Sequence, residues 1–130
     1  VQGLTSPSGL AFDPSRGVVY VSDTGGGRVL AVDLAARTPS VVASGLDGPE
    51  GVAVDRDGSL LVVEGDAGRL VRIGPAGGQP SEVATGLPTR TVGFGLPLLN
   101  YSADVLVRAD GSIVVSGAAD GSLIELTPES

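Results

Sequence analysis

The sequence predicts an all-β fold, a β-propeller of roughly three four-stranded antiparallel blades. The first observation is an internal repeat: Pro7-Ser-Gly-Leu-Ala-Phe-Asp13 recurs as Pro49-Glu-Gly-Val-Ala-Val-Asp55. A Gly-Leu pair stands shortly before each copy, as Gly3-Leu4 and Gly45-Leu46, and Gly86-Leu87 opens a third repeat. A period of about 40 residues filled with short apolar runs is typical of one propeller blade per repeat.

The second observation is the pattern of the central runs. Val18-Val-Tyr-Val21 and Leu60-Leu-Val-Val63 are apolar without alternation. Such runs indicate strands that are buried on both faces. A propeller blade packs between two neighbouring blades, so its central strands are covered in this way.

Turn residues divide each repeat into strands. In the first repeat, the Gly-, Pro-, Asp- and Ser-containing segments 14–17 and 23–27 separate strands. The expected strands of this repeat are Gly9–Asp13, Val18–Ser22, Arg28–Leu34 and Ser40–Ser44. Those of the second repeat are Gly51–Asp55, Ser59–Val63, Arg69–Ile73 and Ser81–Thr85. The third repeat is expected to contain Val105–Arg108, Ser112–Ser116 and Ser122–Leu126.

These strands give a single propeller segment over residues 1–130, with blade 1 at about 5–46, blade 2 at 47–87, an insert at 88–102 and blade 3 at 103–127. The third blade lacks its outer strand, whereas Val1–Leu4 resembles the end of one. Closed propellers have about four to eight blades. We therefore expect the ring to be completed by a second copy or by chain missing from this sequence.

Composition excludes several classes of function. The net charge of −7 disfavours nucleic acid and anionic membrane surfaces as partners. No apolar stretch approaches the roughly 18 residues of a membrane helix, and no targeting segment indicates a compartment. Because His and Cys are absent, a Ser-His-Asp triad, a Cys-His pair and a Cys/His zinc cage are excluded. Oxygen-ligated hard cations, such as Ca²⁺ or another divalent ion, fit the remaining side chains best.

The two repeats resemble NHL repeats and the blades of gluconolactonase-like propellers, the group that includes senescence-marker and strictosidine synthase-like proteins. The residues that carry the resemblance are Pro7–Asp33 and Pro49–Ile73, together with repeat three from Val105 onward. The resemblance implies six blades, a central divalent cation, commonly calcium, and hydrolysis of sugar lactones or related esters in some members. Other NHL proteins bind partners and catalyse nothing.

Two positions of each blade are expected on the same rim of the propeller. The entry of the inner strand carries Glu50 in the second blade, and the exit of the second strand carries Asp23 and Glu64. Glu50, in Pro49-Glu50-Gly51, resembles the inner-strand Glu that ligates the metal in gluconolactonase-like enzymes. The candidate catalytic residues are Glu50 and Glu64. The candidate metal ligands are Glu50, Asp23, Glu64 and Asn100 of the insert.

Each candidate also has a structural interpretation. Asp23 and Glu64 end strands beside Gly-rich turns, where acidic side chains commonly accept backbone hydrogen bonds. Arg28 and Arg69 recur at the starts of third strands, and we expect them to pair with carboxylates of a neighbouring blade. Asp66 follows in a loop and is expected to be a solvated residue.

Two functions follow as hypotheses. The first is a gluconolactonase-like segment that binds a small molecule in the central channel and hydrolyses lactones or esters with calcium. The alternative is a non-catalytic NHL-type module that binds a protein partner, or an inactive fragment. In either case, we expect self-association of the isolated chain to close the ring, because an arc of three blades exposes two apolar faces.

Overall fold

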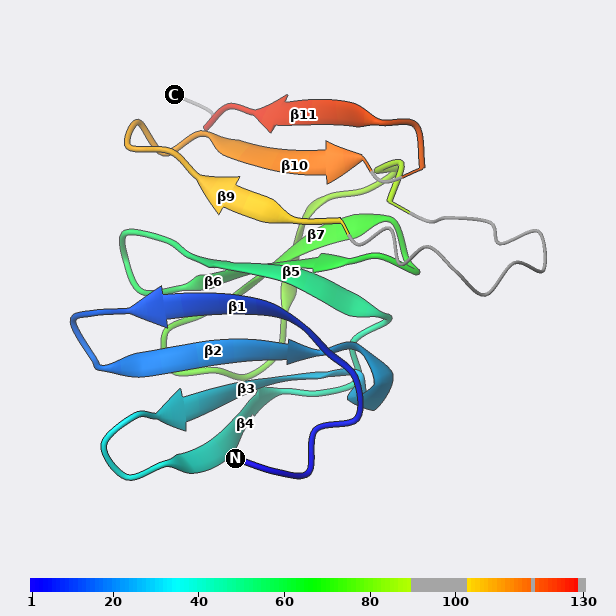
Figure 1. Cartoon of the computed structure of the whole chain (residues 1–130). Helices are drawn as coiled ribbons and strands as arrows, with labels where there is room; N and C mark the ends of the chain where they lie inside the picture. Colours follow the sequence, from blue (N-terminus) through cyan, green and yellow to red (C-terminus); the bar gives the residue numbers. More distant parts are fainter. Residues whose placement is uncertain (90–102, 118, 129–130) are drawn as a thin grey trace.

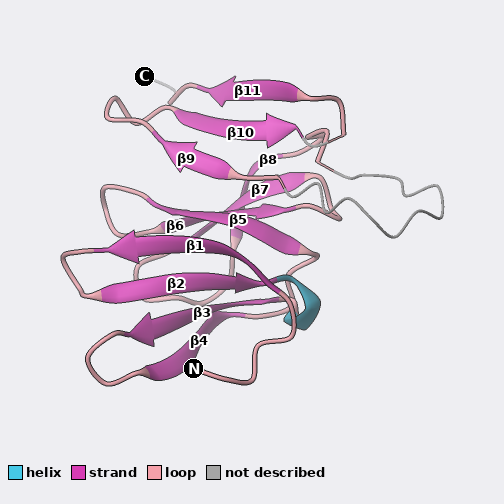
Figure 2. Ribbon diagram, viewed as in Figure 1, coloured by secondary structure: helices cyan, strands magenta, loops and turns pink. Residues whose placement is uncertain are grey.

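The computed structural model describes residues 1–89, 103–117 and 119–128. These residues form three antiparallel sheets stacked as successive blades (Figures 1 and 2). They contain one short 3₁₀ helix and no α-helix, so the predicted all-β propeller architecture is confirmed. None of their helices is long and apolar enough to cross a membrane.

Blades 1 and 2 share one topology, in which each strand pairs with the next along the chain. The elements of blade 1 are β1 (Pro7–Asp13), β2 (Val18–Asp23), the 3₁₀ helix η1 (Thr24–Gly26), β3 (Arg28–Asp33) and β4 (Thr38–Ala43). Those of blade 2 are β5 (Pro49–Val54), β6 (Leu60–Glu64), β7 (Arg69–Ile73) and β8 (Ser81–Ala84).

Blade 3 consists of three strands in the described part of the chain. They are β9 (Val105–Val107), β10 (Ile113–Gly117) and β11 (Ser122–Leu126), in the order β11-β10-β9. The inner strands β1, β5 and β9 face one another in sequence, because β1 contacts β5 and β5 contacts β9. All three begin at the right of Figure 1, at the rim where β2, β6 and β10 end.

The core lies between the blades, and β6 contributes residues to the clusters on both sides of blade 2. Leu60 and Val62 pack in the cluster shared with blade 1, whereas Leu61 and Val63 pack in the cluster shared with blade 3. All five residues of β6 are buried. The alternating directions of strand side chains send neighbouring residues to opposite seams, which explains the unbroken apolar run in the sequence.

A substitution of Leu61 tests how much the seam between blades 2 and 3 contributes to stability, because the Leu61 side chain is 0% exposed. We expect Leu61→Ala to lower the free energy of unfolding by about 2–5 kcal/mol, since it leaves a cavity in a packed cluster. The measurement is urea unfolding followed by circular dichroism. Leu34→Ala, at an exposed turn position, is the control and should change stability little. Equal effects of the two substitutions would argue against a continuous core at this seam.

Glycine lets neighbouring inner strands approach closely at the rim where these strands begin. A Cβ atom on Gly51 would lie 2.6 Å from the Cα atom of Asp104 in blade 3. A Cβ atom on the equivalent Gly9 would collide with the main-chain oxygen of Glu50 in blade 2. The glycine at this point of the repeat is therefore a packing requirement of adjacent blades.

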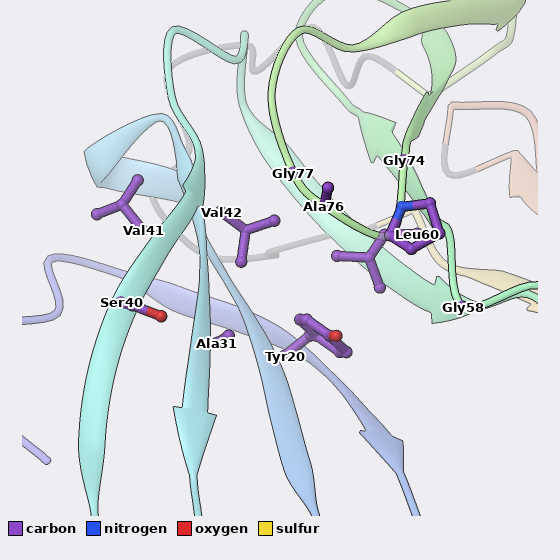
Figure 3. Close-up of a pocket in the computed structure, with 11 residues that line it drawn as sticks. Tyr20, Ala31, Ser40, Val41, Val42, Gly58, Leu60, Gly74, Ala76 and Gly77 are labelled. Atoms are coloured by element: carbon purple, nitrogen blue, oxygen red, sulfur yellow. The ribbon is translucent and has the colours of Figure 1, made fainter. Parts of the chain in front are cut away.

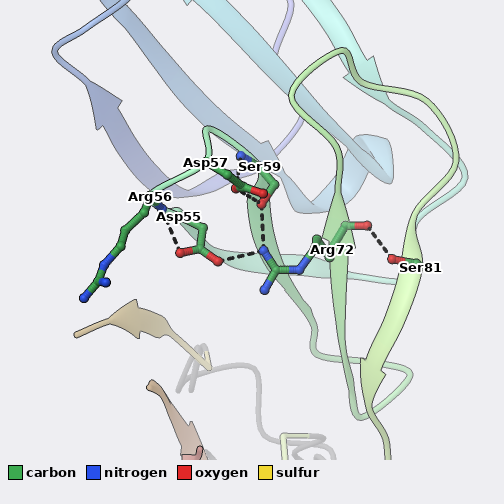
Figure 4. Close-up of polar contacts among 6 residues, drawn as sticks. All are labelled: Asp55, Arg56, Asp57, Ser59, Arg72 and Ser81. Carbon is green, nitrogen blue, oxygen red and sulfur yellow. Dashed lines mark hydrogen bonds and ion pairs between the residues drawn. The ribbon is translucent and has the colours of Figure 1, made fainter. Parts of the chain in front are cut away.

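The same Asp-x-Ser hydrogen-bonded turn occurs four times in the described part of the chain. Asp57 Oδ1 accepts hydrogen bonds from the amide of Ser59 at 2.9 Å and from its hydroxyl at 2.5 Å. The equivalent pairs are Asp13–Ser15, Asp110–Ser112 and Asp120–Ser122. In blade 2 the turn is extended by Arg72, whose Nη1 donates to Ser59 Oγ and to Asp55 Oδ2, each at 2.7 Å (Figure 4).

Because of these turns, we expect the free energy of unfolding to fall in acid. The serine hydroxyl is the main cause that lowers the pKa of each of the four Asp carboxyl groups. A folded-state pKa below the unfolded value of about 3.9 gives stability that is present above this value and is lost as the pH falls through the folded pKa. Glu50, whose pKa is raised, acts in the opposite direction but is one group against these four and Asp23, whose pKa is also lowered.

We therefore expect the urea midpoint to fall steeply as the pH is lowered below about 4. Ser112→Ala should make this dependence shallower, because it removes the hydroxyl that stabilises the Asp110 carboxylate. The measurement is a series of urea titrations at descending pH for both proteins. A midpoint that stays constant or rises in acid would be the contrary result.

Candidate functional site

The candidate site is the rim at which the inner strands begin and the second strands end. Glu50 is the second residue of β5, and Asp23 and Glu64 are the last residues of β2 and β6. All three therefore lie on the same rim, as the alternation of strand directions requires. Asn100, the fourth candidate, lies outside the described residues.

Glu50 is partly buried and bridges two blades. Its Oε2 atom accepts a hydrogen bond of 2.7 Å from the amide of Ala103, at the entry to blade 3. On the other side of the strand, its main-chain oxygen accepts a hydrogen bond from the hydroxyl of Ser22 in blade 1. Among the described residues, Oε1 of Glu50 has no hydrogen-bond partner, so one oxygen of this carboxylate is left for another group.

Asp66 is the acidic neighbour of Glu50. Burial is the main cause that raises the pKa of the Glu50 carboxyl group, and the negative charge of Asp66 raises it further against the effect of the Ala103 amide. Two glycines make room for the two carboxylates. A Cβ atom on Gly65 would collide with the carboxyl group of Glu50, and one on Gly48 would lie 2.5 Å from Oδ2 of Asp66.

The sequence assigns Asp66 to a solvated loop, and Asp66 indeed lies exposed in the turn after β6. Its effect on the Glu50 carboxyl group was not anticipated. The available signal is the small residue beside each acid, in Gly48-x-Glu50 and Gly65-Asp66. Glycine at both positions leaves room for an acidic side chain, that of Asp66 against Gly48 and that of Glu50 against Gly65.

Asp23 is fully buried and its oxygens are already in contact with protein donors. Oδ1 accepts hydrogen bonds from the amides of Thr5 and Ser6, at 2.9 and 2.7 Å, and Oδ2 accepts one from Nε of Arg28 at 3.0 Å. The Ser6 amide is the main cause that lowers the Asp23 pKa, and Arg28 adds to it against the opposing effect of burial. The side chain fixes the segment that leads into β1.

Glu64 repeats this arrangement in blade 2. Its side chain is also fully buried, and Oε1 accepts a hydrogen bond of 2.8 Å from the amide of Asp47, in the segment that leads into β5. Arg69 forms a two-pronged ion pair with the carboxylate through Nε and Nη2. These contacts favour a structural role for Glu64 and Asp23, and their roles as metal ligands or catalytic groups remain predictions.

The two arginines pair within their own blade, not with a neighbouring blade as the sequence suggested. Asp23 stands directly opposite Arg28 in the β2–β3 register, and Glu64 stands directly opposite Arg69 in the β6–β7 register. Opposite charges at facing positions of an antiparallel pair attract each other. The loop between the strands is short, so the partner in the adjacent strand is the nearest acidic group.

The described residues, 1–89, 103–117 and 119–128, contain no group of three or more acidic side chains placed to hold a metal ion. Glu50 and Asp66 are two neighbouring carboxylates. Their oxygen atoms are fewer than the six to eight oxygen ligands typical of Ca²⁺. Their chemistry suits a hard cation, and further oxygens would have to come from other groups.

Two cavities lie at the seams between blades, away from Glu50. One of about 230 Å³ lies between Tyr20, Ser40 and Val42 of blade 1 and Leu60 and the 74–77 turn of blade 2 (Figure 3). Another of about 490 Å³ is lined by Arg72, Ile113 and Pro128, among others. The first has no acidic or basic lining residue, and Figure 3 shows aliphatic side chains pointing into it. Neither cavity is lined by the candidate site residues.

Comparison with known families decides the relationship that the repeats suggested. The model of the SMP-30/gluconolactonase/LRE-like region matches residues 1–95, more than half of the 130-residue chain. The chain belongs to the SMP-30/gluconolactonase/LRE-like family. The predicted resemblance to gluconolactonase-like propellers is confirmed. A sequence search of curated proteins finds no match.

Solved structures of this family and of other propellers resemble the chain. A gluconolactonase from Xanthomonas campestris is 25% identical, with a TM-score of 0.67, over 85% of this chain and 34% of that one. A calcium-binding regucalcin from Agrobacterium tumefaciens is 20% identical, with a TM-score of 0.63, over 85% of this chain and 37% of that one. A PQQ-bound aldose sugar dehydrogenase from Streptomyces coelicolor is 21% identical, with a TM-score of 0.72, over 98% of this chain and 46% of that one.

The chain thus spans 34–46% of the length of these three proteins. The two with identities of 20% and 21% show the fold alone. Together with the family assignment, the comparisons place the chain among gluconolactonase-like propellers.

Proposed function

We propose that this family member binds a small molecule at the rim around Glu50 and, in a complete ring, hydrolyses a lactone or related ester with the help of a divalent cation. The observation that carries the proposal is the Glu50 carboxylate. It is partly buried beside Asp66, one of its oxygens is held by the Ala103 amide, and the other has no partner among the described residues.

The chemistry of the two carboxylates supports a cation at this rim. The partly buried Glu50 and the exposed Asp66 carry like charges that repel each other, and a cation between them relieves the repulsion. Carboxylate oxygens are also the ligands that Ca²⁺ prefers. The regucalcin from Agrobacterium tumefaciens is described as calcium-binding, which supports the same expectation for this family.

The residues of this chain would then have distinct tasks. The Ala103 amide orients Glu50, because it holds Oε2 and leaves Oε1 without a hydrogen-bond partner among the described residues. Asp66 adds negative charge beside it. When bound, a divalent cation supplies polarisation of the carbonyl group of a lactone. Asn100 as a further ligand, and Glu64 as a second catalytic carboxylate, are part of the proposal as predicted from the sequence.

The proposal is tested by two measurements on the 130-residue chain. Calorimetric titration with Ca²⁺ should show saturable binding. Proton release from a sugar lactone in a pH-stat should exceed the spontaneous rate with Ca²⁺ and return to it with a chelator. Absence of both would contradict the proposal. Ca²⁺ binding without hydrolysis would retain the binding site and favour the non-catalytic module.

A further inference from the structure

We propose that Asp47, in the linker between blades 1 and 2, is a site of spontaneous covalent modification, at which the chain rearranges to isoaspartate through a cyclic imide. The inference concerns the chemistry of the main chain and does not depend on the proposed activity. It rests on a comparison of the four Asp-Gly steps in the sequence, which are Asp47-Gly48, Asp57-Gly58, Asp110-Gly111 and Asp120-Gly121.

The rearrangement needs an aspartate, the residue after it and water. The amide nitrogen of the following residue attacks the side-chain carboxyl carbon and forms a new C–N bond, and the hydroxyl group of the neutral acid leaves with the amide proton as water. A solvent water molecule then opens the five-membered imide at the original main-chain carbonyl, so that the main chain runs through the former side chain. Glycine favours the attack, because it has no Cβ atom to hinder the approach.

Exposure and backbone conformation do not distinguish the four steps. The Asp side chain is exposed in each of them. Each following glycine has a positive φ, +63° at Gly48 against +83°, +88° and +72° at the other three. Gly48 is buried, but its amide attacks the adjacent residue and therefore needs no access from solvent.

The glycine amides do distinguish the four steps. In three of them the glycine amide donates to a main-chain carbonyl, Gly58 to Asp55 at 3.0 Å, Gly111 to Arg108 at 2.9 Å and Gly121 to Gly117 at 2.9 Å. Within residues 1–89, 103–117 and 119–128, the Gly48 amide donates to no main-chain carbonyl. An amide that is held by a carbonyl has to break this bond before it can turn to the side chain, and breaking it costs free energy.

The carboxyl groups differ in the same way. Those of Asp57, Asp110 and Asp120 each accept hydrogen bonds at Oδ1 from the amide and the hydroxyl of the serine two residues later. In the described part of the chain, Asp47 forms a hydrogen bond through its amide and none through its carboxyl group. The serine hydroxyl is also the main cause that lowers the pKa of the other three carboxyl groups, so the neutral form that reacts is rarer there.

The modification would act on a linker that is held on both sides of this step. The Asp47 amide donates to Glu64 Oε1 at 2.8 Å, and the Gly48 carbonyl accepts a hydrogen bond of 2.8 Å from the Gly65 amide. Isoaspartate inserts one carbon atom into the main chain between these two hydrogen bonds. We therefore expect one of them to weaken in the modified chain, directly before Glu50 of β5.

The experiment is incubation of the folded 130-residue chain in buffered heavy-oxygen water, at neutral pH and physiological temperature, followed by peptide mapping with fragmentation that distinguishes isoaspartate from aspartate. We expect isoaspartate at Asp47, labelled with heavy oxygen by the water that opens the imide. Its rate of formation should be at least about 10-fold higher than at each of the other three steps, because those steps must first break hydrogen bonds to an amide and to a carboxylate.

Two controls separate the effect of structure from that of sequence. In guanidinium chloride the unfolded chain keeps all four Asp-Gly steps but loses these hydrogen bonds, so the four rates should converge. Asp47→Glu is the matched variant, because glutamate keeps the exposed negative charge but forms the larger, six-membered ring less readily. It should show no isomerisation at position 47, and circular dichroism should show that its strands are retained.

The proposal would be overturned by a folded chain that forms no isoaspartate at Asp47. It would also be overturned if isoaspartate accumulated at Asp57, Asp110 or Asp120 as fast as at Asp47 in the folded chain. A preference for Asp47 that persists unchanged in guanidinium chloride would contradict its basis, because the neighbouring sequence and not the hydrogen bonds would then select the site.

Discussion

Glu50→Gln should strongly weaken cation binding and lactone hydrolysis without lowering the stability of the fold. Glutamine keeps the size of the side chain and an oxygen that can accept the Ala103 amide. It removes the charge that a cation requires, and the affinity for Ca²⁺ should fall by at least the 10- to 100-fold that is roughly typical of supporting residues around a metal.

The stability of this variant should be unchanged or higher. Burial and the neighbouring Asp66 raise the pKa of Glu50, so the folded protein favours the neutral side chain and loses stability when Glu50 ionises above that pKa. Glutamine is neutral at every pH. Calorimetry with Ca²⁺, the lactone assay and urea unfolding measure the three quantities on one preparation.

Glu82→Gln is the matched control, because Glu82 is an exposed residue of the outer strand β8. It should leave Ca²⁺ affinity and hydrolysis unchanged. If Glu50→Gln and the control bind Ca²⁺ equally well, Glu50 is not a ligand. If Glu50→Gln unfolds the protein, the carboxylate serves the seam between blades 2 and 3 instead.

Arg69→Met should have the largest effect on stability of any single change at the rim. It leaves the fully buried Glu64 carboxylate without its cation, although the Asp47 amide still donates to it. Removing one partner of a buried pair costs about 3–5 kcal/mol. Arg69 is 36% exposed, so solvent screens part of the interaction and we expect a loss of about 2–3 kcal/mol.

The double variant Glu64→Gln/Arg69→Met should recover part of this loss, because no buried charge remains and glutamine still accepts the Asp47 amide. Arg56→Met, at an exposed turn position, is the control for removing an arginine. A loss no greater than that of the control would show that the ion pair is unimportant. The double variant also tests the predicted catalytic role of Glu64, since full hydrolysis by a folded double variant would exclude it.

The fold could be predicted because the repeat and its period are visible in the sequence and each strand is bounded by turn residues. The predicted boundaries of the strands were less accurate. β4 begins at Thr38 and contains Pro39, two residues before the expected start at Ser40. Proline donates no hydrogen bond, and an outer strand tolerates it where its free edge faces away from the sheet. β2 and β6 each extend by one residue to include Asp23 and Glu64, because these acids face Arg28 and Arg69 across the hairpin.

The site was predicted less completely, for a physical reason. Strand direction places Glu50, Asp23 and Glu64 at one rim. This placement can be predicted from the sequence alone. The direction of each carboxylate depends on its nearest donors, which are backbone amides and an arginine for Asp23 and Glu64. The approach of Asp66 to Glu50 depends on the space left by Gly48 and Gly65. Neither effect has a periodic signature in the sequence.

The most direct test is the carboxyl carbon resonance of Glu50, observed by NMR during a titration with Ca²⁺. We predict that the Glu50 resonance, and that of Asp66 beside it, shifts and saturates with the same dissociation constant as calorimetry gives, while that of the exposed Asp33 at the opposite rim stays unchanged. A Glu50 resonance that does not respond to Ca²⁺, or that moves only as much as the resonance of Asp33, would contradict the central claim that this rim holds the ligand.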